Sequence, residues 1–281
     1  MKKHCWTTTI KGRAIRRAGA VLVAGVLLPL FASNGMAWAQ QPAGKPAAAP
    51  ATTQAPAASE VDPKAIEALK AMGAYLRTLK SFALHSDTTK DEVLDSGQTI
   101  QFTNTIDIQS KLPNRLRLEV NSDRIQRKIY YDGKTVTQYA PRLNYYATFD
   151  APGTVRETLV AAADKFDLRL PLADLFFWGT DQSGIEDIKS AIEVGASRVG
   201  GVECTHYAFR QDGVDWQLWI ERGKTPLPRK LVITTRDEPA HPQYMAVLRW
   251  DLKASMTDKT FAFVPPKGAQ KITAAAVAAA K

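Results

Sequence analysis

The stretch TIQFTNTIDIQ at residues 99–109 decides the fold class of this chain. Its apolar side chains Ile100, Phe102, Ile106 and Ile108 alternate with polar side chains. An alternation of period two places the two kinds of side chain on opposite faces of an extended strand. We therefore predict a strand with one buried and one solvated face, which is typical of an antiparallel sheet.

The same pattern continues toward the C-terminus. Leu116, Leu118 and Val120 repeat the alternation, and Asp132-Gly133 between two apolar runs predicts a tight hairpin. Further strands are predicted at 143–149, 191–198, 202–210, 214–221, 229–236 and 244–252. The short connections between successive strands favour an antiparallel meander, because a parallel sheet would need a helical crossover between its strands.

Two amphipathic helices are predicted among these strands. Asp62 and Pro63 indicate a helix start, because Asp caps a first turn and Pro fits its first position. An apolar stripe follows at Ile66, Leu69, Met72, Leu76 and Leu79. Thr154 and Glu157 form a capping box for the second helix. Its buried side is predicted to carry Val155, Leu159, Ala162 and Phe166.

A short, very apolar segment, PLADLFFW, follows at 171–178. The helices are too few to form a second complete layer, and placing them on the concave face of one curved sheet would bury both surfaces. The predicted fold class is therefore α+β: an unclosed, strongly curved antiparallel β-barrel with a few helices covering the concave face.

The charge of the chain is concentrated at its N-terminus. Lys and Arg number 37 against 28 Asp and Glu, but residues 1–39 hold six basic residues and no acidic one. Leaving these six out gives 31 basic against 28 acidic residues. This near balance gives no reason to expect nucleic acid as a partner.

Residues 1–39 read as an export signal. A basic start precedes the apolar run AGAVLVAGVLLPLF at 18–31, which is shorter than the ~20 residues that cross a bilayer. Ala37 and Ala39 complete an A-x-A site, so we predict a signal peptide cleaved after Ala39 and an exported, periplasmic protein. The alternative is an uncleaved membrane anchor. Arg16-Arg17 leaves the choice between Sec and twin-arginine export open.

The remainder is predicted to have one folded part. Residues 40–60 are rich in Ala and Pro and read as a disordered linker. The folded part is expected at 61–271, followed by a disordered tail at 272–281. Cys5 would leave with the signal peptide, so Cys204 would stay without an internal disulfide partner.

Four stretches carry a resemblance to a known family: YYDGKTVTQYAPRLNYYA at 130–147, VECTHYAFR and VDWQLWIE within 202–221, TPLPRKLVIT at 225–234, and FAFVPPKGA at 261–269. With these, residues 61–271 resemble a domain-of-unknown-function family of predicted periplasmic proteins, grouped with the LolA/LolB lipoprotein-carrier superfamily. The resemblance implies an unclosed barrel with a helical lid over a hydrophobic cavity. It also implies two kinds of function, because LolA-type carriers hold acyl chains of lipoproteins while the related RseB is a sensor.

A set of large apolar residues forms the candidate ligand-binding site. We expect the cavity or its lid to include Leu159, Leu172, Leu175, Phe176, Phe177, Trp178, Trp216 and Leu218. The alternative is plain core packing, since large aromatic side chains usually fill space. Three consecutive aromatic residues at 176–178 cannot all face one core, so at least one is expected to be exposed or to cover a ligand.

Cys204 and His206 are the candidates for chemistry. Two residues apart on a strand, they share a face, as a Cys/His pair or two metal ligands would. A third ligand or an orienting group is missing at any recognisable spacing, and a buried Cys is commonly a small apolar residue. No P-loop, GxSxG, HExxH, CxxC or GxGxxG motif stands in a fitting context. We therefore predict no enzyme, no metal and no cofactor.

A basic cluster lies at 114–128 and consists of Arg115, Arg117, Arg124, Arg127 and Lys128. It could contact anionic headgroups at a membrane surface or an acidic partner; the alternative is a solvated outer face. Two functions follow. The first is a periplasmic, non-catalytic binding or carrier protein for a lipid, acyl chain or lipoprotein. The second is an RseB-like sensor or interaction module that docks another envelope protein.

Overall fold

The computed structural model describes residues 61–274. The predicted signal peptide at 1–39 and the predicted linker at 40–60 lie outside the described residues, as does the predicted tail from residue 275 onward. Within the described part, every helix is too short or too polar to cross a membrane.

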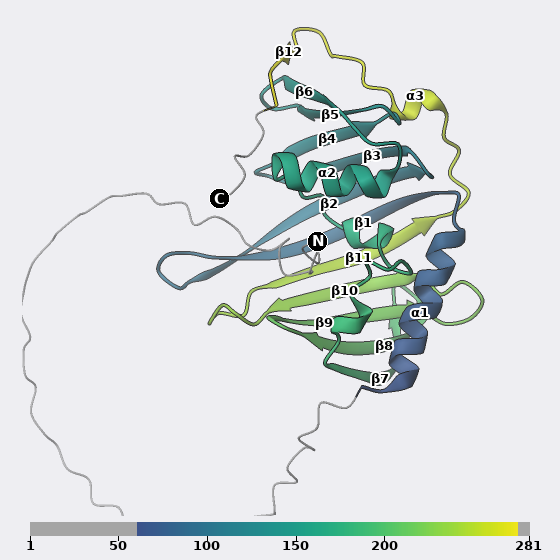
Figure 1. Cartoon of the computed structure of the whole chain (residues 1–281). Coiled ribbons are helices and arrows are strands. Elements are labelled where there is room, and N and C mark those ends of the chain that lie inside the picture. Colours follow the sequence, from purple (N-terminus) through teal and green to yellow (C-terminus); the bar gives the residue numbers. More distant parts are fainter. Residues whose placement is uncertain (1–60, 275–281) are drawn as a thin grey trace, which may run out of the picture. The chain divides into compact units, whose positions relative to one another are not determined.

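The described strands form one twelve-stranded sheet (Figure 1). Its order is β12-β6-β5-β4-β3-β2-β1-β11-β10-β9-β8-β7. The first meander comprises β1 (Ser81–Val93), β2 (Thr99–Lys111), β3 (Arg115–Asn121), β4 (Gln126–Tyr131), β5 (Thr135–Ala140) and β6 (Tyr145–Asp150). The second comprises β7 (Ser190–Val199), β8 (Val202–Gln211), β9 (Val214–Glu221), β10 (Pro228–Thr235) and β11 (Gln243–Asp251). The predicted antiparallel meander is confirmed.

The two meanders join through β1 and β11, which pair antiparallel. Leu84 of β1 faces Ile108 of β2 on one side and Trp250 of β11 on the other. The first of the described strands therefore lies in the middle of the sheet. The order ends at β12 and β7, so the described strands do not close into a barrel. The predicted α+β class, an unclosed antiparallel barrel with few helices, is confirmed.

The register gives the sheet one apolar face, called here the inner face. In β1 the side chains of Phe82 and Leu84 are buried, whereas their neighbours Ala83 and His85 are only partly so. A core cluster extends over the inner faces of both meanders and includes residues of α1 (Pro63–Thr78) and α2 (Val155–Phe166). The alternation in the sequence fixes these faces because successive side chains of a strand point to opposite sides.

Helix α1 begins as predicted. The Asp62 side chain accepts a hydrogen bond from the Lys64 backbone nitrogen at 2.8 Å, with Pro63 in the first turn. The Asp62 backbone nitrogen also donates to the carbonyl of Ala191 at 2.8 Å, which ties the helix start to edge strand β7. The buried stripe of α1 consists of Ala65, Leu69, Met72, Gly73 and Leu76.

The connection between the meanders crosses the inner face (Figure 1). Helix α2 is capped by Thr154, whose hydroxyl oxygen accepts from the Glu157 backbone nitrogen at 3.2 Å. At its other end, Phe166 packs against Phe149 of β6, with 4.2 Å between the centroids of the two tilted rings. Two 3-10 turns follow, η2 (Ala173–Phe176) and η3 (Ile185–Asp187).

Helix α1 holds the segment that contains η2. The Arg77 guanidinium donates to the carbonyls of Phe176 and Leu175 at 2.7 and 2.6 Å. One turn earlier, Gly73 lies directly against Gly179: a Cβ on Gly73 would stand 2.5 Å from the Gly179 nitrogen. Two backbones this close leave no room for a side chain, which explains the glycine at each position.

The C-terminal segment covers part of the opposite, outer face. After α3 (Asp258–Phe261), the ring of Phe263 packs on three tyrosines, Tyr130, Tyr139 and Tyr146, at centroid distances of 5.4, 5.6 and 5.0 Å. The chain then adds β12 (Gln270–Lys271) parallel to β6 at the sheet edge.

Candidate ligand-binding cavity

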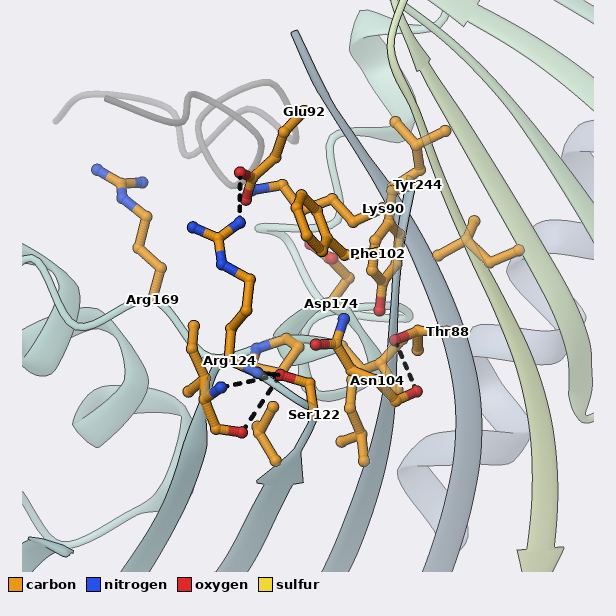
Figure 2. Close-up of a pocket in the computed structure, with 17 residues that line it drawn as sticks. Thr88, Lys90, Glu92, Phe102, Asn104, Ser122, Arg124, Arg169, Asp174 and Tyr244 are labelled. Carbon is orange, nitrogen blue, oxygen red and sulfur yellow. Dashed lines mark hydrogen bonds and ion pairs between the residues drawn. The ribbon is translucent and has the colours of Figure 1, made fainter. Parts of the chain in front are cut away.

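A cavity of about 400 Å³ opens on the inner face where the two meanders meet. Figure 2 shows its lining side chains. They come from β1, β2, β3, β10, β11, the β3–β4 turn and the segment at 169–174 that leads into η2. Volumes of about 300–1,000 Å³ are usual for small-molecule sites. The cavity therefore has the size of a ligand pocket.

Most of the cavity wall is apolar. Its apolar members are Phe102, Ile106, Val120, Ile125, Pro171, Leu172, Leu231 and Ile233. They meet here because the inward positions of strands from both meanders converge on the junction: Ile106 faces Val120 across β2 and β3, and Ile233 faces Tyr244 across β10 and β11. An apolar, concave wall favours the burial of a hydrocarbon group.

Charged side chains lie at the mouth. The Arg124 Nη1 atom is 2.9 Å from the Glu92 carboxylate, and its guanidinium stands 4.4 Å above the centre of the Phe102 ring (Figure 2). Lys90 reaches the same Glu92 carboxylate at 3.9 Å. Arg169 also lines the cavity and pairs with Asp167 at 3.2 Å. An ion pair and a cation–π contact thus link the tips of two hairpins across the opening.

Polar groups are also present inside the cavity. Thr88, Asn104, Ser122, Asp174 and Tyr244 line it. Burial raises the pKa of Asp174 to about 6. Burial, followed by the negative charge of Asp174, raises the pKa of Tyr244, so this phenol stays protonated at neutral pH. Buried polar groups of this kind fix the orientation of a ligand.

The structure brings one of the eight predicted site residues to the cavity, namely Leu172. The other seven lie in or against the packed core around it: Leu159, Leu175, Phe176, Phe177, Trp178, Trp216 and Leu218. Phe176 packs on Phe82 at 6.0 Å between ring centroids. Phe177 is the least buried of the three consecutive aromatic residues and packs against the core.

Sequence reasoning missed most of the lining. One signal was available at Asn104, because the alternation from Phe102 to Ile106 places this amide on the apolar face. Thr88 is paired with Asn104 across β1 and β2 and is likewise directed inward. A polar residue at an inward strand position indicates either a local hydrogen bond or a ligand site.

Cys204 and His206 share the outer face, away from the cavity lining. The Cys204 side chain is 0% exposed, and burial raises the pKa of its thiol. His206 stacks on Trp219 at 3.9 Å and bonds Gln217 at 3.0 Å, while burial lowers its pKa. This environment disfavours a thiolate and an imidazolium alike. Within residues 61–274, no group of three or more His, Cys, Asp and Glu is placed to hold a metal.

The basic cluster does not form one surface. Arg117 and Lys128 both pair with Glu119, Lys128 at 3.0 Å. Arg127 faces Val120 in the β3–β4 register, which directs it to the inner side, and burial lowers its pKa. Arg124 lies at the cavity mouth. Within the cluster, only Arg124 belongs to the cavity lining.

A second hollow, of about 580 Å³, borders β1, β2, β3 and β11. Its charged groups pair with one another or with close neighbours: His85 bonds Asp107 at 2.6 Å, and Arg117 bonds Glu119. A self-paired, charged wall does not favour an apolar ligand, so the cavity at the junction is the better candidate.

Three solved structures are similar to this chain at low sequence identity. The chain is similar to an uncharacterized conserved protein from Thermus thermophilus, with 12% identity, 75% of this chain and 99% of that chain covered, and a TM-score of 0.43. It is similar to the lipoprotein LppX of Mycobacterium tuberculosis, with 9% identity and a TM-score of 0.44; the match covers 69% of this chain and 98% of LppX. It is also similar to a LolA superfamily protein from Nitrosomonas europaea, with 9% identity and a TM-score of 0.35; the match covers 71% of this chain and 97% of that protein.

No functionally curated protein matches the chain. A family model described as "Predicted periplasmic protein (DUF2092)" matches residues 65–275, which is most of the folded part and well over half of the chain. The resemblance read from the sequence is therefore confirmed: the chain belongs to the DUF2092 family of predicted periplasmic proteins.

Proposed function

We propose that this protein is a non-catalytic, periplasmic binding or carrier protein whose cavity holds the acyl chain of a lipid or lipoprotein. One observation carries the proposal: a largely apolar cavity of about 400 Å³ lies between the two halves of the sheet. The family description supports the compartment. Export by a cleaved signal peptide remains a prediction from residues 1–39.

The size of the cavity suits part of an acyl chain. If a methylene takes the ~30 Å³ of a liquid water molecule, the cavity holds on the order of ten methylenes. Burying each contributes roughly 0.8 kcal/mol, or about 8 kcal/mol in all. Association costs of at least ~4 kcal/mol reduce this sum. Micromolar binding therefore requires further contacts from the polar part of the ligand.

A carrier must also release its ligand. The contact of Arg124 with Glu92 and Phe102 links the β3–β4 turn to the β1–β2 hairpin across the mouth. These side chains are partly exposed, and such ion pairs contribute only ~0–1 kcal/mol. A closure this weak opens readily, which suits a cavity that exchanges its contents.

The first experiment is extraction. Protein purified from its native compartment is examined by native mass spectrometry and by lipid extraction, and a bound acyl compound is expected. Binding of an apolar fluorescent dye to delipidated protein then gives an affinity. Absence of both a bound lipid and dye binding would contradict the proposal.

A pair of variants locates the binding site. Val120→Phe adds a ring to the cavity wall and removes space for about two methylenes, so dye affinity should fall about tenfold. Val247→Phe is the matched control, because its register partners Asp87 and Lys230 place Val247 on the outer face. Equal loss of affinity in both variants would count against this cavity.

A second candidate function is the sensor or interaction module. Strand β7 ends the sheet and exposes Ile192 and Val194, whose side chains are 51% and 53% exposed. Val61 bridges this edge at Ala191, and the apolar side chains beyond that bridge favour docking of another polypeptide. A stable protein partner captured by lipid-free protein, together with absent lipid, would favour this function over the carrier.

A further inference from the structure

The side chains that line the cavity change from apolar to polar to charged along the strands, from the packed core toward the hairpin tips. Ile106, Val120 and Leu231 lie nearest the packed core and are apolar. Thr88 and Asn104, which face each other across β1 and β2, come next. Lys90 and Phe102 form the following pair toward the hairpin tip. An apolar end, a polar belt and a charged mouth thus succeed one another, and Figure 2 labels the side chains of the belt and of the mouth.

The polar belt contains the buried hydroxyl of Tyr244, which lies close to the Thr88 side chain. The Tyr244 hydroxyl is buried and makes no hydrogen bond of normal geometry with any described residue. It points toward Thr88 and Asn104 (Figure 2). The Thr88 hydroxyl already donates to the Asn104 carbonyl at 3.2 Å. The contact between the Tyr244 hydroxyl and Thr88 falls outside normal hydrogen-bond geometry, so a well-placed acceptor supplied by a ligand would be favoured here.

The mouth has an excess of positive charge. Lys90, Arg124 and Arg169 line it together with Glu92. Arg169 also pairs with Asp167, so three cations stand against two acids at the mouth, and Asp174 lies farther in. Lys90 and Arg124 share the single carboxylate of Glu92. Cations that outnumber the acids at an entrance attract an anionic head group.

We propose that the ligand is an anionic acyl lipid with its chain against Ile106, Val120 and Leu231, its ester or amide carbonyl at the Tyr244 hydroxyl, and its anionic head at Lys90, Arg124 and Arg169. This inference rests on the proposed function and specifies its ligand class. The three layers match the three parts of such a molecule in order. The hydrogen bond and the charge contacts supply the affinity that the short apolar end lacks.

The test compares matched lipids. Delipidated protein is titrated, below the micelle concentration, with lauroyl lysophosphatidylglycerol, with its dodecyl ether analogue, which lacks the carbonyl, and with lauroyl lysophosphatidylcholine. We expect the ester to bind roughly three- to tenfold more tightly than the ether, the effect of one hydrogen bond. We also expect the anionic head to be preferred over the zwitterionic one.

Variants assign each preference to its group. In the Tyr244→Phe variant, the ratio of the affinity for the ester lipid to the affinity for the ether lipid should fall close to one, and the affinity for the ether lipid should not change. The control variant Tyr130→Phe, on the outer face, should keep the wild-type ratio. Arg169→Gln should reduce the preference for the anionic head, and Lys189→Gln, outside the cavity lining, should not.

The outcomes separate this inference from the proposed function. If no acyl lipid binds, the proposed function fails, and this inference fails with it. If the ester and ether bind equally, or the Tyr244→Phe variant keeps the ester preference, the carbonyl site is wrong while the carrier function stands. Equal affinity for the phosphatidylglycerol and phosphatidylcholine head groups would overturn the inference that the mouth binds an anionic head group.

Discussion

Replacing Gly73 with Ala tests how helix α1 holds the segment at 169–179. A Cβ at this position would stand 2.5 Å from the Gly179 nitrogen and 2.7 Å from its Cα atom. Ordinary contact begins at 3.4 Å, so the two backbones must separate by about 0.9 Å. Both contact atoms belong to the main chain, and no side chain can rotate away. The helix or the segment must therefore move.

The expected cost follows from two opposing effects. Overpacking costs about 1–3 kcal/mol, and a contact between main chains belongs at the upper end of that range. Ala stabilises a helix interior by about 1 kcal/mol relative to Gly, which offsets part of this cost. The net loss of unfolding free energy is about 2 kcal/mol, which corresponds to about 4–8 °C in Tm for a folded part of this size.

Thermal and urea denaturation measure this loss, with Gly153→Ala as the control because a Cβ there meets nothing within 4 Å. Since Pro171, Leu172 and Asp174 of the same segment line the cavity, the affinity for an apolar dye should fall as well. A Gly73→Ala protein that melts at or above the wild-type Tm would refute the reasoning.

Three further predictions concern single groups. Burial raises the pKa of Asp174 from 3.8 to about 6, so the folded state binds a proton that the unfolded state has lost, and the free energy of unfolding declines as pH rises between these values. The Asp174→Asn variant should therefore have an unfolding free energy about 1–3 kcal/mol higher than the wild type at about pH 7.5 and an equal one at about pH 4. Urea denaturation midpoints at the two pH values measure this difference. Arg77→Met removes two hydrogen bonds to the carbonyls of Phe176 and Leu175 and should lower the unfolding free energy by about 2–3 kcal/mol, and an unchanged urea midpoint would argue against the clamp. The Cys204 thiol, 0% exposed and raised in pKa by burial, should react with a thiol reagent only after denaturation, and Cys204→Ala should keep lipid affinity within about twofold; rapid labelling of the folded protein would contradict this.

The strands and helices could be predicted because their signals are local. Ile100, Phe102, Ile106 and Ile108 alternate within eleven residues, and this spacing alone separates two faces of a strand. The cap at Asp62 and the hairpin turn at Asp132-Gly133 also depend only on adjacent residues. The resemblance to the DUF2092 family rested on short motifs of the same kind.

The cavity could not be predicted in the same way. Strand alternation tells which side chains face inward, but it does not tell which inward side chains meet. Phe176, Trp178 and Trp216 face inward and fill space, whereas Asn104 faces inward and borders a void. The difference between a packed and an open position depends on the volume supplied by other segments, and no local pattern encodes it.

The amino-acid sequence by itself determined the strands, their apolar faces, the helix ends and the family, because each depends on residues close together in the chain. Only the tertiary structure decided that β1 pairs with β11, which brings Thr88 and Tyr244 from distant segments to one cavity. Pairing of distant strands depends on the packing of the whole sheet, and the cavity lies at the junction that this pairing creates.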